Sequence, residues 1–184
     1  MLRIKGTVLK SRLVLVEEIA GAAGALRVTG ALEPSDQAEL KGLLASKWYP
    51  FELGKRLDEA IVREVGGGRR DFFEKLGAAS AEKNLGGVHK DFLVLGNPHA
   101  FLEKAPLIYS FYYDAGRREY RKTGEREGVL TTFDATTFSA PDCLTVVGWY
   151  KRGLELCGAK QPRVVEEECR ATGGAVCRYR VAWD

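Results

Sequence analysis

The spacing of hydrophobic residues changes near Gly116, and this change restricts the folds that the chain can adopt. Upstream, apolar side chains recur with a helical period in segments such as 51–65 and 69–85. Downstream, apolar and polar residues alternate, as in 177–183, which predicts strands with one packed face. One helical segment, 139–157, interrupts these strands. The pattern predicts an α+β fold: an N-terminal helical layer packs on a C-terminal antiparallel sheet, with one interposed buried helix.

Local signals place the ends of the other expected elements. Gly21 should end a first helix over residues 7–20, and Pro34 should begin a short one. Ser139 is suited to cap the interposed helix, because Pro141 then falls in the first turn, where its missing N–H is harmless. Strands are expected over residues 117–123 and 127–136, followed by a C-terminal hairpin over residues 164–183.

Length and composition suit one ordinary globular domain. The 184 residues are 45% hydrophobic and 29% charged, without repeats or linkers, so we expect a single domain over residues 1–184. The net charge of +3 is too small to demand a nucleic-acid partner. No apolar stretch is long enough to span a membrane, and residues 1–6 lack the features of a signal peptide. We therefore expect a cytoplasmic protein.

The four cysteines carry the strongest chemical signal. In a reducing cytoplasm they are free thiols, metal ligands or reactive groups rather than a disulfide framework. Cys169 and Cys177 flank the expected hairpin turn. A three-residue loop with a glycine bulge near Gly173 would place them opposite each other, as half of a tetrahedral thiolate site. A two-residue loop would send them to opposite faces of the sheet.

Cys143 and Cys157 lie at opposite ends of the interposed helix. At a rise of about 1.5 Å per residue they are roughly 21 Å apart, so they cannot bind the same metal ion. Cys143 falls in the first helical turn, where the helix dipole favours a thiolate and therefore a metal ligand. Cys157 experiences the opposite field, and we expect it to be a buried core thiol.

The tail Glu166-x2-Cys169-x7-Cys177, with a glycine pair before the second cysteine, resembles the C-terminal signature of 4-vinyl reductase-type domains. These are cytosolic small-molecule-binding modules, similar in fold to subunits of the TRAPP tethering complex. In the phenol-responsive sensors of this group, a cysteine early in a helix binds a zinc ion together with this tail. Cys143 precedes the tail at a similar spacing. The resemblance therefore implies a closed, structural zinc site formed by Cys143, Glu166, Cys169 and Cys177.

Two questions about this site stay open in the sequence. In a regular strand Glu167, not Glu166, shares the face of Cys169. Glu166 therefore needs a β-bulge to reach the metal, and Glu167 is the alternate ligand. The second question is whether the four cysteines are instead ordinary buried thiols, or have a redox or disulfide role.

Over its whole length the chain also resembles a paralogous family that is abundant in myxobacteria and has no established function. The phrases that carry this resemblance lie at residues 48–51, 84–89, 112–120 and 142–149. The resemblance covers nearly the entire chain but implies little about activity.

Aromatic residues along the helical part could line an apolar ligand pocket or simply fill the core. Ligands of the resembled domains lie between the helical layer and the sheet, which implies a pocket for an apolar small molecule at that place. The residues that we assign to this pocket are Trp48, Phe72, Tyr109 and Tyr112.

Two histidines and a basic segment are weaker candidates. Related haem sensors of nitric oxide use one histidine with a Tyr-x-Ser-x-Arg clamp, which residues 109–111 do not supply. We therefore expect His89 and His99 to be satisfied or exposed, without haem. Glutamates interleave the five basic residues of segment 117–126, which favours a solvated strand face; an anionic ligand or an acidic partner is the alternative.

The sequence contains no P-loop, dinucleotide fingerprint or Ser-His-Asp arrangement, so we expect no enzyme. The leading hypothesis is a non-enzymatic small-molecule-binding or sensory domain with a structural zinc site, acting as a homodimer through protein partners. The alternative is a scaffold or tethering-like interaction module without a ligand pocket. A weaker third hypothesis is an enzyme or accessory factor that acts on a hydrophobic substrate.

Overall fold

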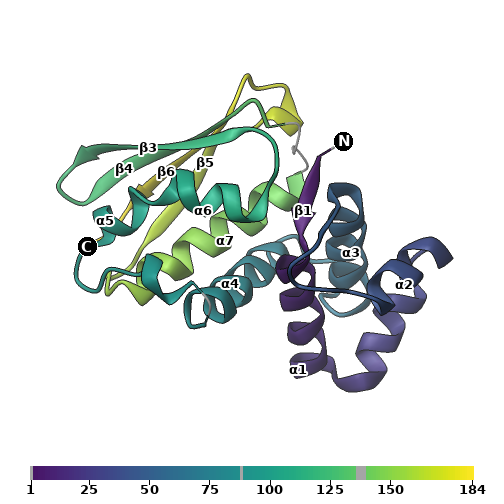
Figure 1. Ribbon diagram of the computed structural model, residues 1–184. Helices are drawn as coiled ribbons and strands as arrows, with labels where there is room; N and C mark the ends of the chain where they lie inside the picture. Colours follow the sequence, from purple (N-terminus) through teal and green to yellow (C-terminus); the bar gives the residue numbers. More distant parts are fainter. Residues whose placement is uncertain (1, 88, 136–139) are drawn as a thin grey trace.

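The computed structural model describes residues 2–87, 89–135 and 140–184, and it confirms the α+β fold class. In Figure 1 the N-terminal helices lie on one side of the molecule and the C-terminal sheet on the other. The described helices are α1 (Gly6–Gly30), α2 (Pro34–Lys41), α3 (Phe51–Glu64), α4 (Phe72–Leu85), α5 (Pro98–Leu102), α6 (Ala105–Tyr112) and α7 (Ala140–Leu156). The described strands are β1 (Arg3–Lys5), β2 (Trp48–Pro50), β3 (Arg117–Gly124), β4 (Glu127–Phe133), β5 (Arg163–Glu168) and β6 (Cys177–Ala182). The expected helix cap, Ser139, lies outside the described residues.

The first helix is longer than expected. It continues to Gly30, but the chain leaves helical geometry at Gly21, where φ is 63° and ψ is −174°. Glycine has no Cβ and adopts this φ without strain. Gly21 therefore ends one helix, as predicted, and a second begins directly after it. Residues 22–30 were not expected to be helical, because their alanines and glycines give no clear apolar period.

The C-terminal sheet has the strand order β3-β4-β6-β5, and all neighbouring strands are antiparallel. Alternation along β6 sends Cys177, Tyr179 and Val181 to a buried face, and Arg178 and Arg180 to solvent. The packed and solvated faces predicted for this strand are confirmed, and the cysteine end of β6 lies on the covered face.

α7 is the interposed helix that the sequence predicts. It lies between the sheet and α4 (Figure 1), and its Tyr150 is only 1% exposed. A Cβ atom on Gly148 of α7 would lie 1.9 Å from the carbonyl oxygen of Glu74. A Cβ atom on Gly77 of α4 would lie equally close to the carbonyl oxygen of Thr145. The backbones of the two helices therefore touch, and only glycine fits at these two positions.

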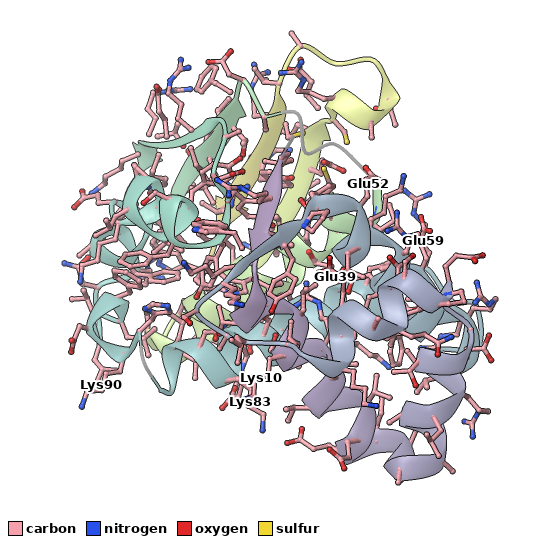
Figure 2. All side chains as sticks on the ribbon, turned by 45° about the vertical axis from the view of Figure 1, so that its right-hand side comes forward. Lys10, Glu39, Glu52, Glu59, Lys83 and Lys90 are labelled. Atoms are coloured by element: carbon pink, nitrogen blue, oxygen red, sulfur yellow. The ribbon has the colours of Figure 1, made fainter. Side chains whose placement is uncertain are left out.

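Charged side chains lie mainly at the surface, among them Lys10, Glu39 and Lys90 (Figure 2). A buried exception is the ion pair between Arg12 of α1 and Asp58 of α3, with a distance of 3.0 Å. None of the described helices has the length and apolar character needed to cross a membrane.

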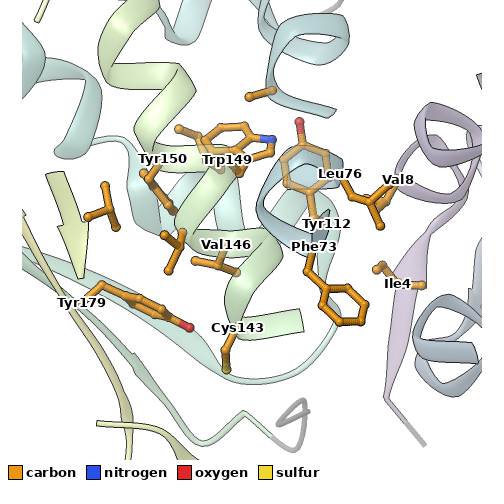
Figure 3. Packing of buried hydrophobic residues seen from close by; sticks show 14 of the residues in the cluster. Ile4, Val8, Phe73, Leu76, Tyr112, Cys143, Val146, Trp149, Tyr150 and Tyr179 are labelled. Atoms are coloured by element: carbon orange, nitrogen blue, oxygen red, sulfur yellow. The ribbon is translucent and has the colours of Figure 1, made fainter. Parts of the chain in front are cut away.

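Aromatic side chains connect α7 to the helices that cover it. Trp149 of α7 meets Tyr112 of α6, with ring centroids 6.0 Å apart, and both belong to the buried cluster shown in Figure 3. Cys143 belongs to the same cluster, at the first turn of α7. The helix thus runs from a cysteine at the sheet to aromatic residues under the helical layer.

Candidate functional site

A β-bulge near the end of β5 decides which glutamate faces the cysteines. Glu166 and Glu168 pair with two adjacent residues of β6, so Glu167 is the extra residue of the bulge. Glu167 forms an ion pair with the exposed Arg180 at 3.0 Å. Because of this bulge, Glu166 lies on the same face of the sheet as Cys169, as a Glu166 ligand requires. The structure accordingly brings Glu166, and not its alternate Glu167, to the cysteines.

The loop that joins the two hairpin cysteines is longer than either turn considered from the sequence. Residues 170–176 form it, with one 3-10 turn and a left-handed Gly173 at φ 95°. The last pair of the ladder before the loop joins Glu168 of β5 to Arg178 of β6. The next residue toward the loop is Cys169 after β5 and Cys177 on β6. The two cysteines therefore stand opposite each other, which is the favourable one of the two predicted registers, reached through a different loop.

Cys143 completes a compact group of potential metal ligands. One ligand atom each from Cys143, Glu166, Cys169 and Cys177 lies within 4.8 Å of the other three. The Cys143 Sγ is 3.4 Å from the Cys169 Sγ and 3.7 Å from the Cys177 Sγ. Two thiolates bound to one tetrahedral zinc ion, each at about 2.3 Å, are about 3.8 Å apart. The sulfur spacing therefore suits a single tetrahedral ion.

The carboxylate of Glu166 supports the same conclusion from hydrogen bonding. Its Oε1 atom is buried, and no described residue donates a hydrogen bond to it. A buried acceptor without a partner costs about 1–3 kcal/mol, and a charged one costs more. A divalent cation would satisfy this oxygen and the neighbouring sulfurs together. Three thiolates and one carboxylate form a donor set that zinc accepts in closed structural sites.

Hydrogen bonds and burial shift the pKa values of the three thiols in different directions. The Cys143 thiol donates to the Cys177 Sγ, and this bond, together with one from the Arg170 N–H, lowers the pKa of Cys177 to about 6. The same bond, reinforced by burial, raises the pKa of Cys143 above its ordinary value. Burial raises the pKa of Cys169. Full deprotonation of the group therefore needs a cation.

Cys157 lies apart from this group, at the other end of α7. Its side chain is 0% exposed, and its carbonyl oxygen accepts a hydrogen bond from Gly96 at 2.8 Å. Burial raises the pKa of this thiol. The location agrees with the expected role of a core thiol.

A cavity of about 40 Å³ lies among α1, α4, α6, α7 and β3, between the helical layer and the sheet. Tyr109 and Tyr112 line it, and their role as ligand contacts stays a prediction. Trp48 and Phe72 do not line this cavity, and their assignment to a ligand pocket stays a prediction that this cavity does not support. Trp48 sits on β2 with the Lys5 ammonium 4.2 Å from its ring. Phe72 begins α4 and packs against the backbone at 66.

Arg118 corrects the expectation of a solvated basic strand. It is 6% exposed, lines the cavity and donates from Nε to the Thr132 Oγ1 at 2.9 Å. Burial disfavours its charge, but the hydroxyl groups of Tyr150 and Tyr179 outweigh that effect, so the pKa of Arg118 is raised. The alternation along β3, in which the two residues flanking Arg118 are exposed, is the sequence signal that could have identified it.

Both histidines have protein contacts of their own. The Nδ1 of His99 is 2.6 Å from the Tyr120 hydroxyl, and the Nε2 is 2.7 Å from the Glu125 carbonyl oxygen. His89 stacks on Phe92 and contacts Phe111, and burial lowers the pKa of its imidazole. His99 is therefore satisfied, as expected, and His89 belongs to an aromatic cluster.

Solved structures of H-NOX proteins share the fold. An H-NOX protein mutant from K. algicida, in the Fe(II) unliganded state, has a TM-score of 0.75 at 11% identity, with 98% of this chain and 96% of that chain covered. An H-NOX protein from S. oneidensis in the Fe(II)NO state has a TM-score of 0.74 at 10% identity, with coverages of 98% and 99%. An oxygen-binding H-NOX domain related to soluble guanylate cyclases has a TM-score of 0.71 at 11% identity, with coverages of 98% and 95%.

The haem of these neighbours does not fit the present chain. Pockets for ligands of drug size occupy about 300–1,000 Å³, whereas the cavity here measures about 40 Å³. Aromatic side chains, including Tyr112, Trp149 and Tyr150, fill the surrounding space. Neither His89 nor His99 lines the cavity. The likeness therefore extends to the fold and not to the cofactor.

Sequence comparison gives one family. No curated protein matches the chain. The family described as "Protein of unknown function (DUF2378)" matches residues 54–184, a stretch that includes the cysteine group, the four-stranded sheet and α4 to α7. This match agrees with the expected membership of a family without established function. The chain therefore belongs to the DUF2378 family.

Proposed function

We propose that the protein is a non-enzymatic small-molecule-binding or sensory domain that holds a structural zinc ion and acts through protein partners. The observation that carries the proposal is the buried group of three thiols around an unsatisfied glutamate oxygen. The sequence resemblance to 4-vinyl reductase-type sensors, whose zinc site has the same order of ligands, supports it. We expect the protein to act in the cytoplasm, as a homodimer.

The zinc ion would join two parts of the chain that are distant in sequence. Cys143 lies in the first turn of α7, whereas Cys169 and Cys177 belong to the terminal hairpin. Trp149 and Tyr150, further along α7, line the cavity. A ligand that moves these aromatic residues would therefore act on the same helix that the zinc ion holds to the sheet. This shared helix gives a physical route from the cavity to the hairpin surface.

The H-NOX fold supports a sensory role, since one neighbour is an oxygen-binding domain related to soluble guanylate cyclases. The cavity occupies the place between helical layer and sheet where the resembled domains hold ligands. We propose a small molecule as the ligand and exclude haem on the cavity volume.

The alternative proposal is a scaffold or tethering-like interaction module, and the small volume of the cavity favours it. Exposed apolar side chains that could contact a partner include Leu26 (73% exposed), Leu95 (81%) and Leu107 (52%). A filled cavity and partner binding through such residues would support this alternative over the sensory role.

Metal analysis under reducing conditions, without chelator, tests the leading proposal. The expected result is about one zinc ion per chain. A Cys169→Ser variant should lose the zinc, while the matched Cys157→Ser variant should retain it. Metal-free wild-type protein that is fully folded would contradict the proposal.

A further inference from the structure

Two tyrosine hydroxyl groups at the cavity have incomplete hydrogen bonding. The hydroxyl groups of Tyr112 and Tyr150 are buried and have no hydrogen-bond partner among the described residues. Their side chains are 5% and 1% exposed, and both line the cavity. A buried hydroxyl group without a partner is unfavourable, and native proteins rarely leave one unpaired. The pair of hydroxyl groups therefore indicates a polar species in the cavity.

Arg118 gives the same cavity a positive charge. Its guanidinium carbon is 5.4 Å from the ring centroid of Tyr150. Nε donates to the Thr132 Oγ1 at 2.9 Å, and the Tyr150 hydroxyl group also interacts with the guanidinium. Among the described residues Arg118 forms no ion pair with a carboxylate, although its charge lowers the pKa of Asp142. The two terminal nitrogens of this buried cation carry four N–H groups, and these can donate to a further acceptor in the cavity.

A second arginine at the cavity, Arg12, has a carboxylate partner, whereas Arg118 has none among the described residues. Arg12 lines the same cavity, but its Nε is paired with Asp58 at 3.0 Å, and its Nη1 donates to the Leu76 carbonyl oxygen at 3.3 Å. A buried cation normally has such a partner, because an unpaired charge in a medium of low dielectric constant is costly. The contrast indicates that Arg118, unlike Arg12, has no carboxylate partner among the described side chains.

We propose that the cavity binds a small planar oxoanion, such as formate, nitrite, nitrate or bicarbonate. The terminal nitrogens of Arg118 would bind two oxygen atoms of the anion, because the guanidinium fork matches planar oxoanions. The hydroxyl groups of Tyr112 and Tyr150 would donate to it. The inference rests on the proposed function, since it names the ligand class of the same cavity in place of the expected apolar molecule.

The cavity volume limits the size of this anion. One water molecule needs about 10–15 Å³ of such space, so about 40 Å³ suits a ligand of three or four non-hydrogen atoms. Aromatic and aliphatic walls, including Trp149 and Val146, lower the local dielectric constant and strengthen the attraction to Arg118. The site therefore favours a compact anion over a phenol or an aromatic acid.

Calorimetric titration of the purified protein with formate and nitrate tests the inference. Sodium gluconate, whose anion is too large for the cavity, sets the ionic strength, and phenol serves as the apolar probe. We expect saturable anion binding that weakens by about tenfold in Tyr150→Phe and by about a hundredfold in Arg118→Leu. Tyr120→Phe is the matched control: its hydroxyl group bonds to His99, outside the cavity, and anion binding should be unchanged.

The phenylalanine variants keep the test valid if Arg118→Leu does not fold. Tyr112→Phe and Tyr150→Phe each remove a hydroxyl group that has no described partner, so both should melt at or above the wild-type temperature. Equal zinc content in all variants would show that the metal site is intact. A lower melting temperature would mean that these hydroxyl groups have partners within the protein and would overturn the inference.

The other outcomes separate this inference from the proposed function. Equal anion affinity in all variants would overturn the inference. Binding of phenol without binding of formate or nitrate would overturn the inference and leave the sensory proposal standing. Binding of no probe, with ordered water alone in the cavity of a crystal structure, would overturn both the anion site and the ligand-binding role.

Discussion

The two ends of α7 hold cysteines that are equally buried but differ in their neighbours. Cys143, 1% exposed, lies beside two further thiols and the unsatisfied oxygen of Glu166. Cys157, 0% exposed, lies in the hydrophobic core, without a second described ligand group beside it. Burial alone therefore does not define the role of a cysteine in this chain. The neighbouring donor atoms make one end of the helix a candidate metal centre and leave the other a packing residue.

Removal of the metal should give the largest effect and should act on one end of α7. A chelator in excess should lower the free energy of unfolding by about 5 kcal/mol or more, because the binding energy of a structural zinc ion is folding energy. Hydrogen exchange should show faster exchange of the hairpin amides and the first turn of α7. Amides near Cys157 should keep their protection. Equal loss of protection at both ends would contradict the comparison.

Serine substitutions at the two ends should differ by several kcal/mol. Cys143→Ser removes a metal ligand and should cost about 4 kcal/mol, in the range of lost metal sites. Cys157→Ser places a hydroxyl group in the core and should cost about 1 kcal/mol. Chemical denaturation, with zinc content measured in parallel, gives both values. Similar losses in the two variants would mean that Cys143 is also a simple core thiol.

The pH dependence of stability should be larger at the metal end of α7. Burial raises the pKa of Asp142, adjacent to Cys143, from 3.8 to about 7, although the Tyr113 hydroxyl group donates to its Oδ1 at 3.0 Å. The folded state therefore prefers the protonated acid. This contribution is fully present below pH 4 and is lost as the pH rises through about 7.

The size of that contribution can be measured by difference, so that the pH dependence of zinc binding cancels. Between pH 4 and 8, wild-type protein should lose on the order of 2 to 4 kcal/mol relative to Asp142→Asn. The control at the other end of α7 is Glu155→Gln, since Glu155 forms a partly exposed ion pair with Arg152. If wild-type protein gained stability relative to Asp142→Asn as the pH rises, the raised pKa of Asp142 would be contradicted. The same would follow if wild-type protein lost equal stability relative to Asp142→Asn and to Glu155→Gln.

The two glutamates of the bulge should show the smallest effect and the finest distinction. Glu166→Gln removes the charge that the zinc ion requires and should weaken zinc binding by about 10- to 100-fold. Glu167→Gln breaks a surface ion pair and should change stability by less than about 1 kcal/mol, with zinc affinity unchanged. Competition with a zinc-binding dye measures both affinities. If zinc binding were weaker in Glu167→Gln and unchanged in Glu166→Gln, Glu167 and not Glu166 would be the metal ligand.

Local patterns and a family resemblance together led to the group at the first turn of α7. The alternation in β6 and the helical period of α7 separate Cys157 from the other three cysteines, and the resemblance implies that these three are ligands with Glu166. The sequence predicts the bulge only indirectly, because Glu166 needs it to reach the metal. One extra residue in a strand does not clearly change the alternation of apolar and polar residues. The loop of residues 170–176 was not predicted, since a 3-10 turn has little sequence signature.

The cavity could not be predicted to the same extent, because its walls come from five separate elements, α1, α4, α6, α7 and β3. Trp48 and Phe72 are aromatic like Tyr109 and Tyr112, and only the packing of the helices separates the two pairs. The sequence predicts a solvated position for Arg118, because a cluster of charges is usually exposed. Its burial depends on the tyrosines that surround it, and these come from α6, α7 and β6.

X-ray absorption at the zinc edge tests the central claim most directly. The purified protein should contain about one zinc ion per chain, with three sulfur atoms at about 2.3 Å and one oxygen atom at about 2.0–2.2 Å. Glu166→Gln should alter the oxygen shell and leave the three sulfur atoms in place. Absence of zinc from folded protein, or a shell that contains histidine nitrogen or only two sulfur atoms, would contradict the assignment of Cys143, Glu166, Cys169 and Cys177.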